Sequence, residues 1–273
     1  MKNGALHADM NTNDGLEAEQ RVIDLNCDFG EGFGAYAFGQ DEELLAYVSS
    51  VNIACGFHAG DPHTIREAVE RSVRAGVAIG AHPGLPDRLG FGRREMAVSP
   101  EEVYDYALYQ IGALDAFVRA AGGKLRHVKP HGALYHMAGR SPALAAAFVR
   151  AVRAYDPALV LYAQGGSELL SEASRQGIGS AAEIFADRTY REDGTLTPRT
   201  EPNAVHRTAE AALVQTIGII TGGHVATAGG QRVPLQGDTV CLHGDGPHAA
   251  AFAARLHQGL IAAGIGIRPP HRS

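Results

Sequence analysis

The sequence contains no tryptophan and only three cysteines, Cys27, Cys55 and Cys241, none of them in a CxxC pair. In a chain of 273 residues, such a sparse and odd count fits a reducing compartment better than a disulfide framework. No apolar run approaches the roughly 20 residues that span a bilayer, and residues 1–20 are polar, unlike a signal peptide. We therefore expect a cytoplasmic protein without membrane contact, in which residues 1–20 form a disordered or loosely attached extension.

Clusters of positive charge are also missing. The chain has 24 Lys and Arg against 30 Asp and Glu, a net charge of −6, and no basic stripe. This argues against a nucleic-acid partner, because phosphate backbones are bound by concentrated basic residues. Apolar residues make up 45% of the chain and charged residues 20%, so a sizeable core can be buried.

Two common catalytic motifs are absent. There is no G-x-S-x-G nucleophile elbow and no G-x-x-x-x-G-K-[ST] phosphate loop. Their absence argues against an α/β-hydrolase and against an autonomous P-loop kinase. The segment Gly30–Gly34 is rich in glycine, but Asp28 and Glu31 would repel a phosphate there unless a cation intervenes.

What the sequence does contain is a repeated alternation of strand and helix patterns. Seven apolar, β-branched runs are typical of buried strands: Val22–Asn26, Ser50–Ala54, Val77–Ala81, Leu125–Lys129, Leu159–Ala163, Gly179–Phe185 and Thr239–His243. Helical patterns between most of them predict an α/β fold with a parallel sheet, either a closed barrel or doubly wound. No linker or low-complexity segment interrupts the chain, so residues 21–273 are predicted to form one domain.

Several helices have clear N-terminal signals. Asp61 is predicted to be an N-cap because proline follows it, and Ser99-Pro100-Glu101-Glu102 is a capping box. Ser141-Pro142 opens a further helix in the same way. Two connections break the alternation: residues 82–98 predict a long irregular loop, and residues 222–238 predict a β-hairpin with a two-glycine turn.

Charged and polar residues follow the strands directly. They are Asp28 and Glu31, His58 and Asp61, His82 and Asp87, Lys129 and His131, Glu183 with Asp187 and Arg188, and His243 with Asp245. In a parallel barrel the carboxyl ends of all strands lie on one face, which is where active sites are built. Convergence of acids, imidazoles and a lysine is suited to proton transfer at a small polar substrate.

Some of these residues are open to a purely structural interpretation. Asn26, inside the first strand, can satisfy backbone groups within the barrel or contact a substrate. Asp61 is better explained as a helix cap than as a catalyst. Lys129 is expected to end a buried strand, which is unusual for a lysine. Arg93, on a glycine-rich loop, is either an ordinary solvated charge or an anion-binding group.

A metal site and a cysteine nucleophile are two further hypotheses. A carboxylate–imidazole set for a divalent ion is available in Asp28, His58, His82 and His243. No histidine pair at helical spacing on a predicted helix supports it. Cys27 and Cys55 stand at strand ends and each could act as a thiolate, although buried structural cysteine is the commoner case.

Seven segments of the chain, in order, are similar to those of a known family. They are Asp24–Gly34, Asn52–Pro62, Gly80–Gly84, Gly90–Arg94, Val128–Tyr135, Phe185–Arg188 with Tyr190, and His243–Asp245. On these motifs the chain, from about residue 21 to about residue 263, resembles the LamB/YcsF family. Cys27 departs from the pattern, because alanine is expected at that position.

The resemblance implies a fold and an activity. The fold is a seven-stranded β/α barrel of the glycoside hydrolase/deacetylase type. The activity is the ATP-dependent, hydrolytic ring opening of 5-oxo-L-proline to L-glutamate, giving ADP and phosphate, together with partner subunits B and C. It leaves open whether ATP binds this chain or a partner, and whether a divalent metal is present.

The resemblance also assigns hypothetical roles to site residues. Those expected to be catalytic are Asp28, His58, His82, Lys129 and His131. Those expected to bind substrate or anions are Asn26, Glu31, Asn52, Arg93, Asp187, Arg188, His243 and Asp245. Lys129 and the two arginines would neutralise carboxylate or phosphate, the three histidines would transfer protons, and Asp28 and Glu31 would orient water or a cation.

Two alternatives to this function remain. One is a divalent-metal-dependent deacetylase or amidohydrolase that acts alone, which would turn over without ATP. The other is a non-catalytic scaffold subunit, in which replacing the strand-end histidines would leave the activity of the complex intact.

Overall fold

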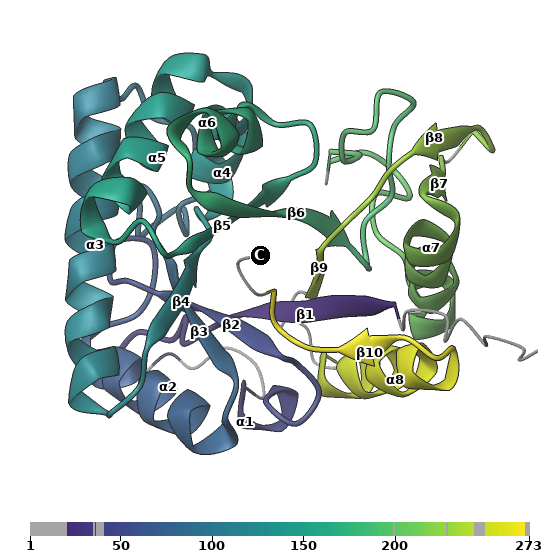
Figure 1. The fold of residues 1–273 in the computed structure, drawn as a ribbon, viewed down its shortest axis with the longest axis horizontal. Coiled ribbons are helices and arrows are strands. Elements are labelled where there is room, and N and C mark those ends of the chain that lie inside the picture. Colours follow the sequence, from purple (N-terminus) through teal and green to yellow (C-terminus); the bar gives the residue numbers. More distant parts are fainter. Residues whose placement is uncertain are drawn as a thin grey trace, which may run out of the picture.

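The centre of the molecule is a closed barrel of parallel strands (Figure 1). The computed structural model describes residues 21–34, 36, 41–198, 200–227, 229–242 and 249–270. Within these residues seven strands form the barrel: β1 (Val22–Phe29), β2 (Ser50–Ala54), β3 (Ala78–His82), β4 (Leu125–Val128), β5 (Val160–Gln164), β6 (Gly179–Phe185) and β9 (Thr239–Leu242). The sequence prediction of seven strands is confirmed.

Pairing of the first and last barrel strands decides between the two predicted architectures. β1 pairs in parallel with β2 on one side and with β9 on the other, so the sheet closes on itself. A short strand β10 (Gly266–Ile267) pairs in parallel with the first residues of β1, Val22 and Ile23. β1 runs to Phe29, three residues beyond the predicted Asn26, and Asp28 therefore lies inside the strand and not after it.

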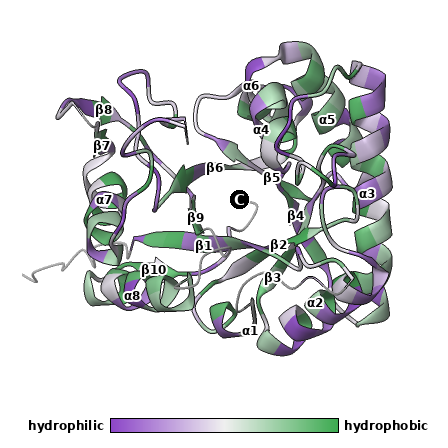
Figure 2. Ribbon diagram, turned by 180° about the vertical axis from the view of Figure 1, so that it is seen from behind, coloured by the Kyte–Doolittle hydropathy of each residue, from purple (hydrophilic) through white to green (hydrophobic). Residues whose placement is uncertain are grey.

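Helices surround the barrel, as Figure 1 shows. They are α1 (Asp41–Leu44), α2 (Pro62–Ala75), α3 (Pro100–Ala120), α4 (Gly132–Arg140), α5 (Pro142–Tyr155), α6 (Glu168–Gln176), α7 (Ala209–Gly222) and α8 (Ala249–Ala262). The predicted starts are confirmed: Asp61 caps α2, Ser99 and Glu102 form the capping box of α3, and Ser141 caps α5. Figure 2 shows the outer helices banded in both colours, as expected of helices with one buried side.

The two irregular connections are also as predicted. Residues 83–99 contain no helix or strand, and β7 (His224–Ala226) pairs with β8 (Arg232–Pro234) as an antiparallel hairpin. None of the helices that the structure describes is long and apolar enough to cross a membrane. The predicted extension of residues 1–20 lies outside the described residues, as do His243 and Asp245.

Candidate functional site

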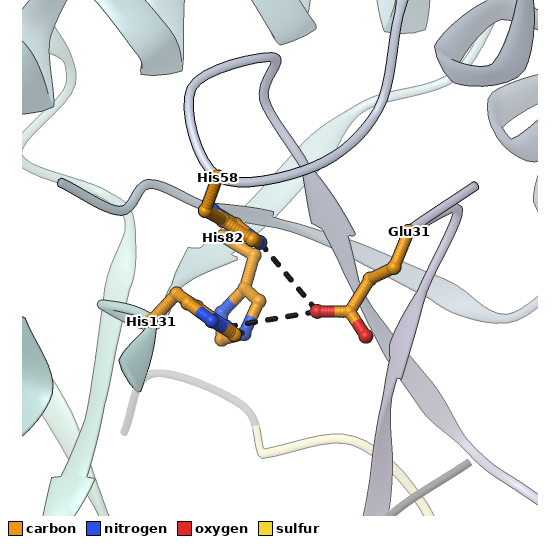
Figure 3. Close-up of side chains that lie close together, drawn as sticks. All are labelled: Glu31, His58, His82 and His131. Atoms are coloured by element: carbon orange, nitrogen blue, oxygen red, sulfur yellow. Dashed lines mark hydrogen bonds and ion pairs between the residues drawn. The ribbon is translucent and has the colours of Figure 1, made fainter. Parts of the chain in front are cut away.

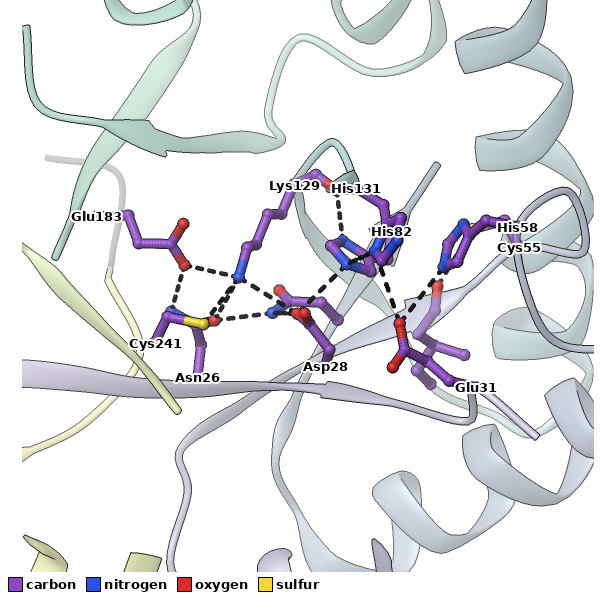
Figure 4. Close-up of polar contacts among 12 residues, drawn as sticks. Asn26, Asp28, Glu31, Cys55, His58, His82, Lys129, His131, Glu183 and Cys241 are labelled. Atoms are coloured by element: carbon purple, nitrogen blue, oxygen red, sulfur yellow. Dashed lines mark hydrogen bonds and ion pairs between the residues drawn. The ribbon is translucent and has the colours of Figure 1, made fainter. Parts of the chain in front are cut away.

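Two adjoining groups of polar side chains occupy the carboxyl end of the barrel (Figure 4). The lysine cluster consists of Asn26, Asp28, Asn52, Lys129, Glu183 and Cys241, and the histidine cluster consists of Glu31, His58, His82 and His131. A cavity of about 490 Å³ opens beside them and is lined by members of both. Its size is that of a pocket for a small ligand.

Lys129 is the centre of the lysine cluster. It follows β4 directly, and only 4% of its side chain is exposed. The Nζ atom is 2.8 Å from Glu183 Oε1, 3.2 Å from Asp28 Oδ1 and 3.1 Å from Cys241 Sγ. Figure 4 shows it reaching between the two carboxylates. A buried ammonium held by two carboxylates is expected to stay charged.

The charges of this cluster stabilise one another. Burial alone would lower the pKa of Lys129, but the carboxylates of Asp28 and Glu183 outweigh it and hold that pKa well above its usual value. Burial would raise the pKa of Asp28, but His82 and Lys129 hold it well below the usual range. The cavity is therefore bordered by a fixed ammonium next to a fixed carboxylate.

Two amides support these charges from within the barrel. Asn26 accepts hydrogen bonds through Oδ1 from Asn52 and Lys129, and donates through Nδ2 to Glu183 and Thr239. Asn52 also donates to Asp28, at 3.0 Å. Both amides are fully buried and occupied by protein partners, so they position Asp28 and Lys129.

The histidine cluster brings together side chains from four consecutive connections (Figure 3). Glu31 follows β1, His58 follows β2, His82 ends β3, and His131 is the N-cap residue of α4. One ligand atom from each lies within 4.8 Å of every other, an arrangement that could hold a metal ion. The rings of His58 and His131 stack in parallel, 3.7 Å apart.

Two histidines of the cluster are each bonded to the backbone through one ring nitrogen. His82 Nδ1 is 2.8 Å from the carbonyl oxygen of Lys129, and His131 Nε2 is 2.8 Å from that of Phe91. Burial lowers the pKa of His131 to about 3 and holds the pKa of His58 well below its usual value. These two imidazoles are therefore neutral near pH 7.

The irregular loop after β3 packs directly on the histidines. A Cβ atom at Gly84 would lie 2.5 Å from His58 Nδ1, and one at Gly92 would lie 2.7 Å from the Cβ of His58. Asp87 fixes the loop by accepting hydrogen bonds from the backbone of Gly90 and from the side chain of Arg94. Glycine is required at these two positions because the backbone approaches the rings so closely.

Replacing Gly84 by alanine is expected to displace His58 and to destabilise the fold. Overpacking of this kind costs about 1–3 kcal/mol, which urea unfolding would detect together with a large loss of activity. The matched control is Gly218→Ala in α7, where an added Cβ meets no atom within 4 Å. Because alanine favours a helix, the control should gain roughly 0.5–1 kcal/mol. Equal stability of the two variants would contradict this packing.

The remaining predicted anion-binding residues belong to neither the lysine cluster nor the histidine cluster. Arg93 and Arg188 line the cavity, Arg93 exposed and Arg188 buried. Arg188 donates to the backbone carbonyls of Ala204 and Thr197, which fixes its guanidinium. Asp187 is half-buried at the end of β6. His243 and Asp245, the last members of the predicted set, lie outside the described residues.

Two hypotheses from the sequence need correction. Among the described residues, His58 and His82 group with Glu31 and His131, whereas the expected set used Asp28 as its carboxylate; its other member, His243, lies outside the described residues. Asp28 lies instead between Lys129 and His82. The cysteine nucleophile is also wrong for Cys55, because burial raises the pKa of this thiol to about 12. Cys27 is fully buried.

Some site residues were not chosen from the sequence. Glu183 and Cys241 contact Lys129, yet neither was in the expected site. The signal for Glu183 was a single carboxylate within the apolar run Gly179–Phe185, since an unpaired charge is rarely buried. Tyr135, a buried phenol that lines the cavity, followed the lysine motif without an assigned role.

Comparisons with known proteins agree with the fold and motifs. Residues 23–273 match the LamB/YcsF family. A Geobacillus kaustophilus protein, named as the A subunit of 5-oxoprolinase, is 57% identical, over 92% of this chain and 98% of the relative. A Brevibacillus brevis protein of the same name is 54% identical, over 90% and 97%. The crystal structure of a lactam utilization protein from Thermus thermophilus superposes with a TM-score of 0.87 at 46% identity, over 90% of this chain and 99% of that one. The chain therefore belongs to the LamB/YcsF family.

Proposed function

We propose that this chain opens the ring of 5-oxo-L-proline by ATP-dependent hydrolysis to L-glutamate, giving ADP and phosphate, together with partner subunits B and C. The structural observation that carries the proposal is the buried, charged Lys129 beside neutral histidines at a cavity of about 490 Å³. The names of the relatives, a 5-oxoprolinase component and a lactam utilization protein, supply the substrate class.

The chemistry of the substrate explains the composition of the site. A five-membered lactam is an unreactive amide, and phosphorylation of its oxygen by ATP makes the carbon open to attack by water. The carbon–nitrogen bond of the resulting tetrahedral carbon then breaks as the nitrogen takes up a proton, which leaves an acyl phosphate. A second water hydrolyses this acyl phosphate and releases phosphate and the carboxylate of glutamate. Such a reaction requires a cation near the developing oxyanion, a base for water and an acid for the nitrogen.

We assign complementary roles to Lys129 and Asp28. The ammonium of Lys129, held at one edge of the cavity, stabilises negative charge on the amide or phosphate oxygens. Asp28 and Glu31 orient water or a cation, and His58, His82 and His131 transfer protons. Asn26 and Asn52 hold the two charged groups in position.

The outer residues are proposed to bind the substrate carboxylate or phosphate. Arg93 is exposed at the cavity with its guanidinium 5.1 Å from the centre of the Phe91 ring, and Arg188 adds a fixed charge. Asp187, His243 and Asp245 complete the proposed set.

The proposal is tested by measuring glutamate from 5-oxo-L-proline with the untagged chain, ATP and both partner subunits, and then omitting each component in turn. We expect glutamate only in the complete mixture. Nucleotide binding to the isolated chain, measured separately, tells which protein holds ATP. Full activity in a mixture without this chain would overturn the proposal.

A second candidate function is supported by the histidine cluster. Glu31 with three histidines resembles the ligand composition of hydrolytic metal sites, which would suit an amidohydrolase acting alone. This candidate requires turnover without ATP or partner subunits, and loss of that turnover with a chelator.

A further inference from the structure

Two backbone contacts fix the proton positions on His82 and His131. A carbonyl oxygen can only accept a hydrogen bond, so His82 Nδ1 donates to Lys129 and His131 Nε2 donates to Phe91, each at 2.8 Å. A neutral imidazole carries one N–H, and the other nitrogen is then a lone pair. In the neutral His131 the lone pair is consequently on Nδ1, and the nitrogen of His82 that faces it is Nε2.

These two nitrogens lie 2.9 Å apart, and Asp28 Oδ1 lies 3.3 Å from the same His82 Nε2. Two acceptors at that distance repel unless a positive centre lies between or beside them. Glu31 Oε1 brings a negative charge 3.6 Å from His131 Nδ1 and 3.5 Å from His58 Nε2. Neither ring nitrogen of the buried His58 has a hydrogen-bond partner. Ligand atoms of four residues thus lie within 4.8 Å of one another, which calls for a cation among them, either a proton or a metal ion.

We propose that Glu31, His58, His82 and His131 bind one divalent transition-metal ion of the zinc type. With Zn–N bonds of about 2.0–2.1 Å, ligand atoms at the corners of a tetrahedron lie about 3.3 Å apart. Three distances in the cluster, 2.9, 3.5 and 3.6 Å, are close to this value, and every pair of ligand atoms lies within 4.8 Å, so small side-chain movements would complete the site. The outward N–H groups bonded to backbone carbonyls are the usual support for metal-binding histidines.

The ligand composition selects the class of metal. Three imidazoles and one carboxylate suit zinc, cobalt or nickel, whereas magnesium prefers an octahedron of oxygen ligands. The ion is therefore distinct from the magnesium that accompanies ATP. Because His58 and His131 are stacked in parallel, both can coordinate one ion only if the rings tilt toward it, so binding should open the stack.

The inference concerns the same site as the proposed function and replaces direct proton transfer by the three histidines with metal binding, but its test needs no lactam, ATP or partner. The untagged chain is treated with chelator, desalted and titrated with Zn²⁺, and bound metal is counted by mass spectrometry. Co²⁺ is used in parallel, because tetrahedral coordination gives it strong visible absorption. We expect one tight site per chain, a melting temperature that rises with Zn²⁺, and no comparable effect of Mg²⁺.

Two variants and two matched controls locate the site. Glu31→Gln and His82→Gln are each expected to weaken Zn²⁺ binding at least tenfold and to change the Co²⁺ spectrum. Glu67→Gln and His63→Gln, both on the outside of α2, should leave binding unchanged. Far-UV circular dichroism and unfolding without metal verify that each variant folds.

Three results would overturn the inference: no tight Zn²⁺ site, binding that both cluster variants retain, or Mg²⁺ competing as well as Zn²⁺. In those cases a shared proton, and not a metal, joins His82 and His131. Tight Zn²⁺ binding without glutamate formation by the complete mixture would refute the proposed function alone. Glutamate formation without a metal site would refute this inference alone.

Discussion

Replacing Lys129 by methionine is expected to lower kcat for glutamate formation by about 10²–10³, the usual effect of removing a group that stabilises an oxyanion. It should also lower the free energy of unfolding by about 3–5 kcal/mol, because it leaves the buried carboxylates of Glu183 and Asp28 without their cation. Urea unfolding of the isolated chain and the activity of the complete mixture would measure the two effects.

A second substitution separates the two roles of Lys129. In the Lys129→Met/Glu183→Gln double variant one buried carboxylate is neutralised, so part of the lost stability should return while activity stays low. Lys124→Met, at an exposed position just before β4, is the matched control and should change neither property. Recovery of activity along with stability would show that Lys129 is only structural.

The second large effect is expected for His131→Gln. His131 lies between His82, Glu31 and the loop carbonyl of Phe91, and loss of a positioned acid or base costs about 10²–10⁴ in rate. We expect the loss mainly in kcat, since glutamine retains a polar group in contact with the loop. Steady-state kinetics of the complete mixture would measure it.

His63→Gln is the control for this variant, because His63 is an exposed histidine on α2. It should keep the wild-type kcat. If His131→Gln were as active as this control, the result would favour a scaffold role for the chain over a catalytic role for the carboxyl end of the barrel.

Much of the fold was predictable because its signals are local. A buried parallel strand needs an uninterrupted apolar run, and a helix needs its cap, so Ser50–Ala54, Gly179–Phe185 and the capping box at Ser99 were predicted with their observed boundaries. Closure of the barrel was not predictable from the alternation, because β1–β9 pairing joins residues more than 200 positions apart.

The sequence predicted that polar side chains at the strand ends form the site, but not that they divide into a lysine cluster and a histidine cluster. The direction of each side chain within the barrel decides which carboxylate contacts which cationic group. Because side chains alternate along β1, Asp28 points toward Lys129. Glu31, which follows the strand, lies beside the histidines instead. Glu183 was named among the strand-end residues but was given no role, because it is a single charge within an apolar strand. The proton positions on His82 and His131 depend on loop carbonyls far away in the sequence.

The most direct test of the central claim is to measure glutamate and ADP together in one reaction that contains 5-oxo-L-proline, ATP, the partner subunits and this chain. We predict that both products appear in equal amounts, that omitting ATP abolishes glutamate, and that replacing wild type by Lys129→Met lowers glutamate formation by about 10²–10³. Glutamate formed by the chain alone, without ATP and sensitive to chelator, would contradict the account and identify a metal-dependent amidohydrolase.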